Sequence, residues 1–204
     1  MKEALYYKKL KNKILECTLC PRNCVINKNM RGFCHARENQ NGKLYSLVYG
    51  KPCAVHVDPI EKKPLFMYLP GHLSYSIGTA GCSMSCKFCQ NFEISQARPE
   101  DAPSLDLPPK RVVEEAINSN CVSIAYTYTE MAGTAAEYVL DTAKLAKKEK
   151  VKNVIVSNGF INKRPLKDLC KYIDAANIDL KSFNDNFSFM FLKAKYSSCL
   201  PSIF

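Results

Sequence analysis

The placement of eleven cysteines constrains this 204-residue chain more than any other feature. Seven of them fall into two groups, Cys17, Cys20, Cys24 and Cys34 followed by Cys82, Cys86 and Cys89. An odd cysteine count and the absence of a secretory signal argue against a disulfide framework, and close spacing favours metal-bound thiolates. We expect the others to be small buried apolar side chains; these are Cys53, Cys121, Cys170 and Cys199.

The second group has the spacing C-x3-C-x2-C, in the segment Cys82-Ser-Met-Ser-Cys86-Lys-Phe-Cys89. Three thiolates in one loop can ligate three irons of a [4Fe–4S] cluster, because each cysteine takes one iron. The fourth iron is then open to a small molecule. A structural zinc site normally has four ligands, and no fourth cysteine or histidine lies close in the sequence. The spacing therefore favours a cluster with an open iron.

The first group, C-x2-C-x3-C-x9-C, is a four-ligand set for zinc or for a second iron–sulfur cluster. Pro21 and Gly32 permit the tight turns that a small metal site needs. His35 follows the last cysteine and is an alternative ligand. The residues leave the choice between zinc and iron open.

Residues 1–70 read as a Cys-rich, loop-rich N-terminal segment with many Pro and Gly residues. Residues 43–49 follow the turn dipeptide Asn41-Gly42 and predict a strand of a hairpin. A segment of this kind buries little apolar area by itself. We expect it to depend on a metal or on packing against the rest of the chain.

From residue 71 to 187 the chain reads as an α/β core with about four parallel strands. The predicted strands are residues 73–78, 122–127, 153–156 and 176–180. The predicted helices are residues 110–118, 134–150 and 165–172, the second opening on a Thr134–Glu137 capping box. Strands that alternate with helices at this spacing form a parallel sheet.

Polar residues follow the carboxyl end of each predicted strand, where parallel α/β sheets place their active sites. They are Cys82 after the first, Glu130 after the second, Asn158 after the third, and Asp179 and Lys181 at the fourth. Asp179 and Lys181 are two residues apart, so an extended backbone points both side chains to the same face.

The formal net charge is +10, from 29 basic and 19 acidic residues. The basic residues are 23 Lys and six Arg, spread along the chain, which is typical of a solvated surface and argues against nucleic-acid binding. No apolar run reaches the ~18 residues of a membrane-spanning helix. The N-terminal residues lack the apolar stretch of a secretory signal, so we expect a cytoplasmic protein with no membrane partner.

The segment Cys82–Cys89, with Phe88 before the last cysteine, resembles the signature of the radical S-adenosylmethionine (SAM) superfamily. The longer stretch 76–95 resembles the pyruvate formate-lyase activating-enzyme branch, and within it most closely the radical SAM family of the AmmeMemoRadiSam system. Three further segments support that narrower match: Cys17–Cys24, Arg31–Cys34 and Asp58–Pro64. The resemblance covers roughly residues 5–187 and is specific.

The resemblance implies that Cys82, Cys86 and Cys89 hold a [4Fe–4S] cluster whose open iron is chelated by the amino and carboxylate groups of SAM. One-electron reduction, from a flavodoxin-type or ferredoxin-type donor, cleaves SAM to methionine and a 5′-deoxyadenosyl radical, which abstracts hydrogen from a substrate. A radical SAM oxidoreductase of activating-enzyme type is expected, with a partner protein or a small molecule as substrate. No residue is predicted to be catalytic in its own right.

The family's second-strand motif, often Gly-Gly-Glu, aligns with Tyr128-Thr129-Glu130, which implies that Glu130 binds the SAM amino group. An Asp-x-Lys motif aligns with Asp179-Leu-Lys181 and implies a contact to the methionine or ribose part of SAM. Asn158, in the segment Ser-Asn-Gly, is a candidate for the same pocket.

The sequence departs from the family at Met131, where proline is expected, and at His35, where glycine is expected. Residues 188–204 are an atypical tail, whereas the family continues into a six-stranded partial barrel. The expected fold is therefore an incomplete radical SAM (β/α) partial barrel. Two alternatives remain: a catalytically inactive fragment that binds a cluster, or a zinc-stapled binding module with a basic surface.

Overall fold

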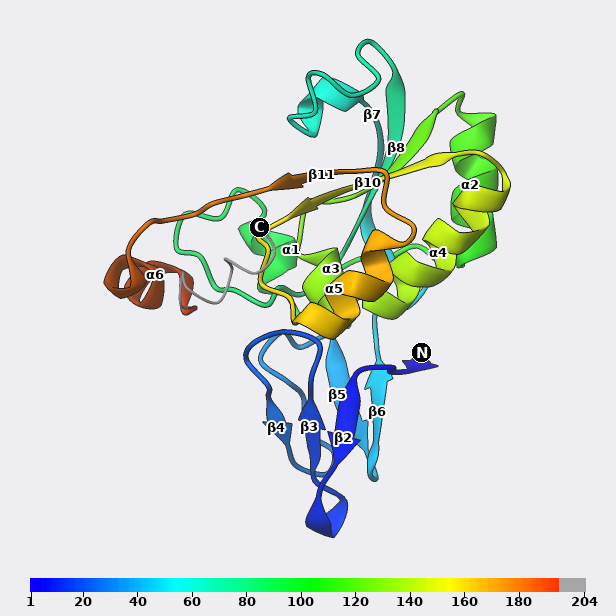
Figure 1. Cartoon of the computed structure of the whole chain (residues 1–204). Coiled ribbons are helices and arrows are strands. Elements are labelled where there is room, and N and C mark those ends of the chain that lie inside the picture. Colours follow the sequence, from blue (N-terminus) through cyan, green and yellow to red (C-terminus); the bar gives the residue numbers. More distant parts are fainter. Residues whose placement is uncertain (195–204) are drawn as a thin grey trace.

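The computed structural model describes residues 1–194, so Cys199 and residues 195–204 of the tail lie outside the described part. A central five-stranded sheet forms the main body, and two small three-stranded sheets lie below it in Figure 1. Among the described residues, no helix is both long enough and apolar enough to cross a membrane.

The central sheet has the strand order β11-β10-β9-β8-β7. Its strands are β7 (Pro52–Pro59), β8 (Leu73–Thr79), β9 (Ser123–Tyr126), β10 (Lys152–Ser157) and β11 (Ala175–Ile178). Strands β8 to β11 are mutually parallel, which confirms the predicted α/β core with four parallel strands.

The fifth strand, β7, was not predicted; it runs antiparallel to β8 from Pro52 opposite Thr79 to Pro59 opposite Leu73. Its sequence begins and ends with proline and has several exposed positions, so it lacks the apolar run of the other strands. Because β7 lies within residues 1–70, the segment that the sequence sets apart contributes an edge strand to the main sheet.

Helices α2 (Pro109–Asn118), α4 (Ala136–Lys148) and α5 (Lys163–Cys170) cover one face of the sheet (Figure 1). Buried side chains of β8, β9 and β10 pack beneath them, among them Ile77, Ile124 and Ile155. The three helices are amphipathic, so their apolar faces meet the apolar face of the sheet and their lysines face the solvent.

The predicted capping box at Thr134 and Glu137 is wrong. A short helix α3 (Met131–Thr134) precedes α4, and the Thr134 hydroxyl donates to the Glu130 carbonyl at 2.7 Å. The Glu137 carboxylate accepts from the Leu5 backbone N–H at 2.8 Å and forms an ion pair with Arg37. Partners 100 and 132 residues away in the sequence thus take the acceptor that the local motif would have used.

The two small sheets have the orders β1-β6-β5 and β2-β3-β4. Their strands are β1 (Lys2–Glu3), β2 (Tyr7–Lys9), β3 (Leu15–Cys17), β4 (Val25–Ile26), β5 (Arg37–Gln40) and β6 (Lys43–Ser46), with a 3-10 turn η1 (Lys11–Lys13) between β2 and β3. The predicted hairpin at Asn41-Gly42 joins β5 to β6. Leu15, Leu19 and Leu44 belong to the same buried cluster as the helix side chains, so the small sheets share the core of the main body.

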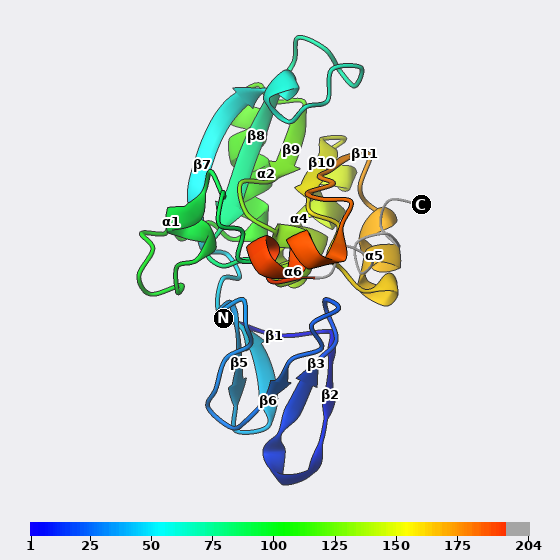
Figure 2. The ribbon, with the colours of Figure 1, turned by 90° about the vertical axis from the view of Figure 1, so that its left-hand side faces the viewer.

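The opposite face of the central sheet carries short segments instead of long helices. The 3-10 turn η2 (Ile60–Lys62) places Ile60 against Ala125 and Val154 on this face. Two helices, α1 (Phe92–Ser95) and α6 (Asp185–Leu192), lie near the carboxyl ends of the strands (Figures 1 and 2).

Candidate functional site

A cavity of about 680 Å³ opens at the carboxyl ends of the parallel strands. Its wall includes every residue proposed from the sequence for the cluster and for SAM: Cys82, Cys86, Cys89, Glu130, Asn158, Asp179 and Lys181. Four different strand ends supply these side chains, because parallel strands bring their carboxyl ends to one edge of the sheet. Their roles as ligands stay predictions.

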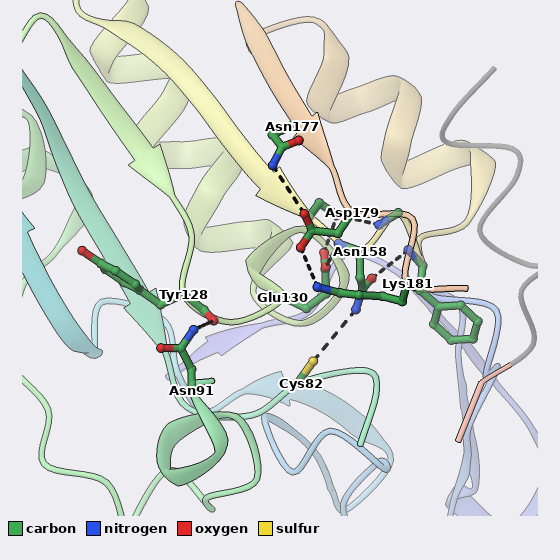
Figure 3. A network of polar contacts seen from close by, with 11 residues as sticks. Cys82, Asn91, Tyr128, Glu130, Asn158, Asn177, Asp179 and Lys181 are labelled. Atoms are coloured by element: carbon green, nitrogen blue, oxygen red, sulfur yellow. Dashed lines mark hydrogen bonds and ion pairs between the residues drawn. The ribbon is translucent and has the colours of Figure 1, made fainter. Parts of the chain in front are cut away.

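The three thiols lie in the loop between β8 and α1. Burial raises the pKa of the Cys82 thiol to about 12, and burial also raises the pKa of Cys86. The Asn158 Nδ2 lies 4.0 Å from the Cys82 Sγ (Figure 3), and the Ser95 Oγ lies 3.3 Å from the Cys89 Sγ. Binding of iron would release the protons from such thiols, because the thiolate is the ligand.

Helix α6 supports this loop from the outside. The backbone N–H of Ser85 donates to the Leu192 carbonyl, and that of Lys87 donates to the Phe191 carbonyl, both at 3.0 Å. The orphan carbonyls at the end of α6 are thereby satisfied by the cysteine loop. Residues 188–194, which the sequence assigns to an atypical tail, contribute to the frame of the candidate site.

Glu130 is the buried acid of the site, with 2% of its surface exposed. Its carboxylate accepts from the Asn158 backbone N–H at 2.6 Å, from the Ser157 hydroxyl at 2.8 Å and from the Gly133 backbone N–H at 3.1 Å. Burial raises the pKa of Glu130 to about 7, because desolvation outweighs the hydrogen bonds that favour the charged form. The group is therefore poised between charge states near neutrality.

Asp179 and Lys181 form an ion pair, with Nζ and Oδ2 2.7 Å apart, and Figure 3 shows both beside Asn158. The Asn177 Nδ2 lies 3.4 Å from the other Asp179 oxygen. Burial alone would lower the pKa of Lys181, but Asp179 and the nearby Cys86 and Cys89 thiols raise it. Lys181 thus carries its positive charge beside the cysteine loop.

Tyr128, Asn91 and Lys63 of the cavity wall received no role of their own from the sequence, although each lies in a segment that the family resemblance singles out. Tyr128 has a left-handed backbone with φ 65°, a conformation that glycine adopts without steric cost. Its carbonyl accepts from the Asn91 Nδ2 at 2.7 Å (Figure 3), and its hydroxyl donates to the Asp58 Oδ2 at 2.5 Å. The motif Asp58–Pro64 was the sequence signal for this part of the wall.

Cys17 ends strand β3, whereas Cys20, Cys24 and Cys34 lie in the connections outside the strands. All ten cysteines of the described chain are free thiols. Cys17, Cys20 and Cys34 are buried, and burial raises their pKa values, with the neighbouring cysteines adding to the effect. Within residues 1–194, however, no three His, Cys, Asp or Glu side chains are gathered closely enough to hold one metal ion. The predicted zinc or second cluster at these residues stays a prediction.

Arg22 connects the N-terminal cysteines to the candidate cluster loop. Its Nε donates to the Ser83 carbonyl at 2.6 Å, its Nη2 donates to the Lys193 carbonyl, and its guanidinium lies 3.5 Å from the ring centroid of Phe33. Burial lowers the pKa of Arg22, while thiols of both cysteine groups, including Cys82, oppose that change. A fixed cation therefore lies between the two groups.

The comparisons with known proteins agree with this arrangement. The model of the radical SAM superfamily matches residues 76–197. The chain is 45% identical over 185 residues to the uncharacterized protein MJ0808 of Methanocaldococcus jannaschii, which covers 91% of this chain and 55% of that protein. It is 33% identical over 87 residues to the uncharacterized protein MJ0674 of the same organism, covering 42% of this chain and 21% of that protein.

The chain thus spans about half the length of MJ0808. The family model covers more than half of the present chain, including the end of β8, the cysteine loop and strands β9 to β11. The fold agrees with that match, since a parallel sheet brings Glu130, Asp179 and the three thiols to one cavity. The chain belongs to the radical SAM superfamily.

Proposed function

We propose that this protein is an iron–sulfur enzyme that reductively cleaves SAM at a [4Fe–4S] cluster, as an oxidoreductase of the activating-enzyme-like branch. The observation that carries the proposal is that Cys82, Cys86 and Cys89 share one cavity with Glu130 and Lys181 in a chain of the radical SAM superfamily. When bound, the cluster and SAM supply a 5′-deoxyadenosyl radical that abstracts hydrogen from the substrate.

The residues present fit the cluster by type and by position in one loop, and a cluster needs its three thiols at three separate irons, so it does not require the single-ion site that the described residues lack. Three free thiols of one short loop line the cavity, and each cysteine ligates one iron in a cluster of this kind. Asn158 lies at hydrogen-bond reach of the Cys82 sulfur, and Arg22 places a positive charge near the same thiol. Hydrogen bonds and charges at the sulfurs tune the potential of such a centre.

The residues around the thiols also fit SAM, which carries an ammonium, a carboxylate and a sulfonium. Glu130 can hold the ammonium, because an opposite charge favours the ionised form of a carboxyl whose pKa is about 7. Asp179 and Lys181 offer one acceptor and one donor to the methionine or ribose part.

An electron donor of flavodoxin or ferredoxin type is part of the proposal, and the hydrogen donor is a partner protein or a small molecule. A cytoplasmic location is also proposed. It is supported by the ten described cysteines, all of which are free thiols and require a reducing compartment.

The test is anaerobic reconstitution with iron and sulfide, followed by electron paramagnetic resonance of the reduced protein with and without SAM. We expect a [4Fe–4S]⁺ signal that changes shape when SAM is added and that is lost in Cys82→Ala. The exposed Cys170 lies on α5 and lines no part of the cavity, so Cys170→Ala is the matched control and keeps the signal.

Two other results would replace the proposal. A cluster signal that does not respond to SAM would identify a cluster-binding fragment without activity. A colourless protein that holds stoichiometric zinc and loses it only when the N-terminal cysteines are substituted would identify a zinc-stapled binding module.

A further inference from the structure

The motif Asp58–Pro64 has no role in binding the cluster or SAM under the proposed function, but its last residues form part of the cavity wall. It begins at the end of β7 and continues through the turn η2. Ile60 packs against the sheet, which turns the next residues toward the open space. Lys62, Lys63 and Pro64 all line the cavity.

Lys63 is unusual because its side chain is buried, with 1% of the residue exposed. Its ammonium donates to the Asp58 Oδ2 at 2.6 Å and lies 4.8 Å from the ring centroid of Tyr128. An ammonium has three N–H donors, and Asp58 is the one hydrogen-bond acceptor that the described residues offer it. Besides Asp58, the Tyr128 ring is the other group that the described residues place against this ammonium, so its remaining N–H groups have no oxygen acceptor there.

The charges at this wall do not balance. The Asp58 carboxylate accepts from both Lys62, at 2.8 Å, and Lys63, and also from the Tyr128 hydroxyl. Two ammonium groups therefore face one carboxylate, which leaves an excess of one positive charge. The remaining lysine of the cavity, Lys181, is already paired with Asp179.

The lysine pair follows β7, whose Asp58 lies opposite Ser74 near the start of β8, whereas the cysteine loop follows Thr79 at the end of β8. The charges that act on Lys63 are those of Asp58 and Lys62, whereas those that act on Lys181 include Cys86 and Cys89. The cavity therefore has a thiol-lined part with its own lysine and a second part in which Lys62 and Lys63 share the single carboxylate of Asp58.

We propose that Lys62 and Lys63 form a subsite for an anionic group, a carboxylate or a phosphate, of a small-molecule substrate. This inference rests on the proposed function and names the substrate class of the same site. An anion there would accept the free N–H donors of Lys63 and neutralise the excess charge, and charge-assisted bonds of this kind are among the stronger ones. The enclosed volume suits a small molecule.

The test is isothermal titration calorimetry of the reconstituted full-length protein with inorganic phosphate and with succinate, at low salt and without SAM. We expect at least one of these probes to bind the wild type and its affinity to fall at least tenfold in Lys63→Met. Lys110 is an exposed lysine of α2 paired with Glu114, and Lys110→Met is the control that binds the probe as the wild type does.

Because Lys63→Met leaves the Asp58 carboxylate without its buried partner, the double variant Asp58→Asn with Lys63→Met is made as well. It removes both charges and so avoids an unpaired buried carboxylate. It too is expected to lose the probe. Equal affinity in the wild type and in a folded Lys63 variant, or no binding of either probe to the wild type, would overturn the subsite.

The source of the anion is tested by adding SAM to the wild type that holds the probe. Simultaneous binding supports a separate substrate group, whereas displacement would assign the subsite to the SAM carboxylate and overturn the inference. A SAM-responsive cluster without probe binding would defeat this inference alone. Probe binding without such a cluster would defeat the proposed function and leave the anion site standing.

Discussion

Arg37 of β5 and Glu137 of α4 form a bidentate ion pair inside the protein, with 2.9 Å between Nη2 and Oε1 and 3.1 Å between Nη1 and Oε2. Their side chains are 1% and 0% exposed. The pair joins one of the small N-terminal sheets to a helix that covers the main sheet. The N-terminal segment is thereby fixed to the core by a polar contact as well as by apolar packing.

Breaking this pair on one side is expected to be costly. Glu137→Gln leaves the Arg37 guanidinium buried without its counter-charge, and such changes cost about 3–5 kcal/mol. The free energy of unfolding in urea measures the loss. The double variant Arg37→Met with Glu137→Leu removes both charges and should lose much less; a loss below about 1 kcal/mol in the single variant would contradict the expectation.

Gly81 determines how closely the N-terminal segment approaches the cysteine loop. A Cβ at this position would lie 2.2 Å from the Cys34 carbonyl oxygen, and the backbone has φ +89°. Gly71 has a similar φ of +76° with nothing within 4 Å of its would-be Cβ, so it is the matched control. Gly71→Ala should cost about 1–2 kcal/mol from backbone strain alone.

Gly81→Ala should cost that amount and roughly 1–3 kcal/mol more, because the backbone around Cys34 must move. Urea unfolding of the two variants measures the difference. An equal decrease in the free energy of unfolding of both variants would show that the backbone around Cys34 can move without a measurable loss of stability.

Glu130 should make the stability of the cluster-free protein depend on pH. Its pKa is about 7 in the folded protein against 4.5 for an ordinary glutamate, so the folded state holds a proton more tightly than the unfolded chain. The stabilising effect of that proton is complete below pH 4.5 and is lost as pH rises through 7. The total change is roughly 3 kcal/mol, at 1.36 kcal/mol for each pKa unit.

The measurement compares the unfolding free energy of the wild type and of Glu130→Gln from pH 4 to pH 8. Glutamine keeps the size and an acceptor but does not titrate. The wild type should therefore lose stability relative to the variant between pH 4.5 and 7, and parallel curves would refute the raised pKa.

Arg22 should raise the reduction potential of a cluster bound at Cys82. Removing a cation stabilises the oxidised, less negative state of a centre relative to the reduced state. For Arg22→Gln an effect of about 1 kcal/mol corresponds to a fall of roughly 40 mV in the midpoint potential. A redox titration followed by electron paramagnetic resonance measures it.

Arg164 is an exposed arginine on α5 that lines no part of the cavity, so Arg164→Gln serves as the control. Its midpoint potential should equal that of the wild type. An unchanged potential in a folded Arg22→Gln protein would show that Arg22 acts on packing alone.

The sequence predicted the parallel core because its signals are local. The strand predicted at residues 153–156 contains the continuous apolar run 154–156, and α2 begins with Pro109 at its first position. Cysteine spacing fixed which loop is the candidate cluster site, since three thiols within eight residues cannot spread far apart. The side chains after each strand then had to meet at one edge of the sheet.

Predictions from local sequence patterns were wrong or incomplete where a residue far away in the sequence determines the local structure. The Thr134–Glu137 pair has the residues of a capping box, but Glu137 is held by Arg37. Strand β7 has a weak local pattern and forms because β8 offers an unpaired edge. Tyr128 has a left-handed backbone, and its hydroxyl donates a hydrogen bond to Asp58, 70 residues away in the sequence. Neither property can be predicted from the spacing of residues along the chain.

The sequence by itself therefore determined the superfamily, the parallel sheet and the loop that carries the three thiols, because short-range periodicity and spacing encode them. The tertiary structure decided the raised pKa of Glu130, the burial of Lys63 and the position of Arg22 between two groups of cysteines. These properties depend on desolvation and on charges brought close by folding, and neither quantity exists along an extended chain.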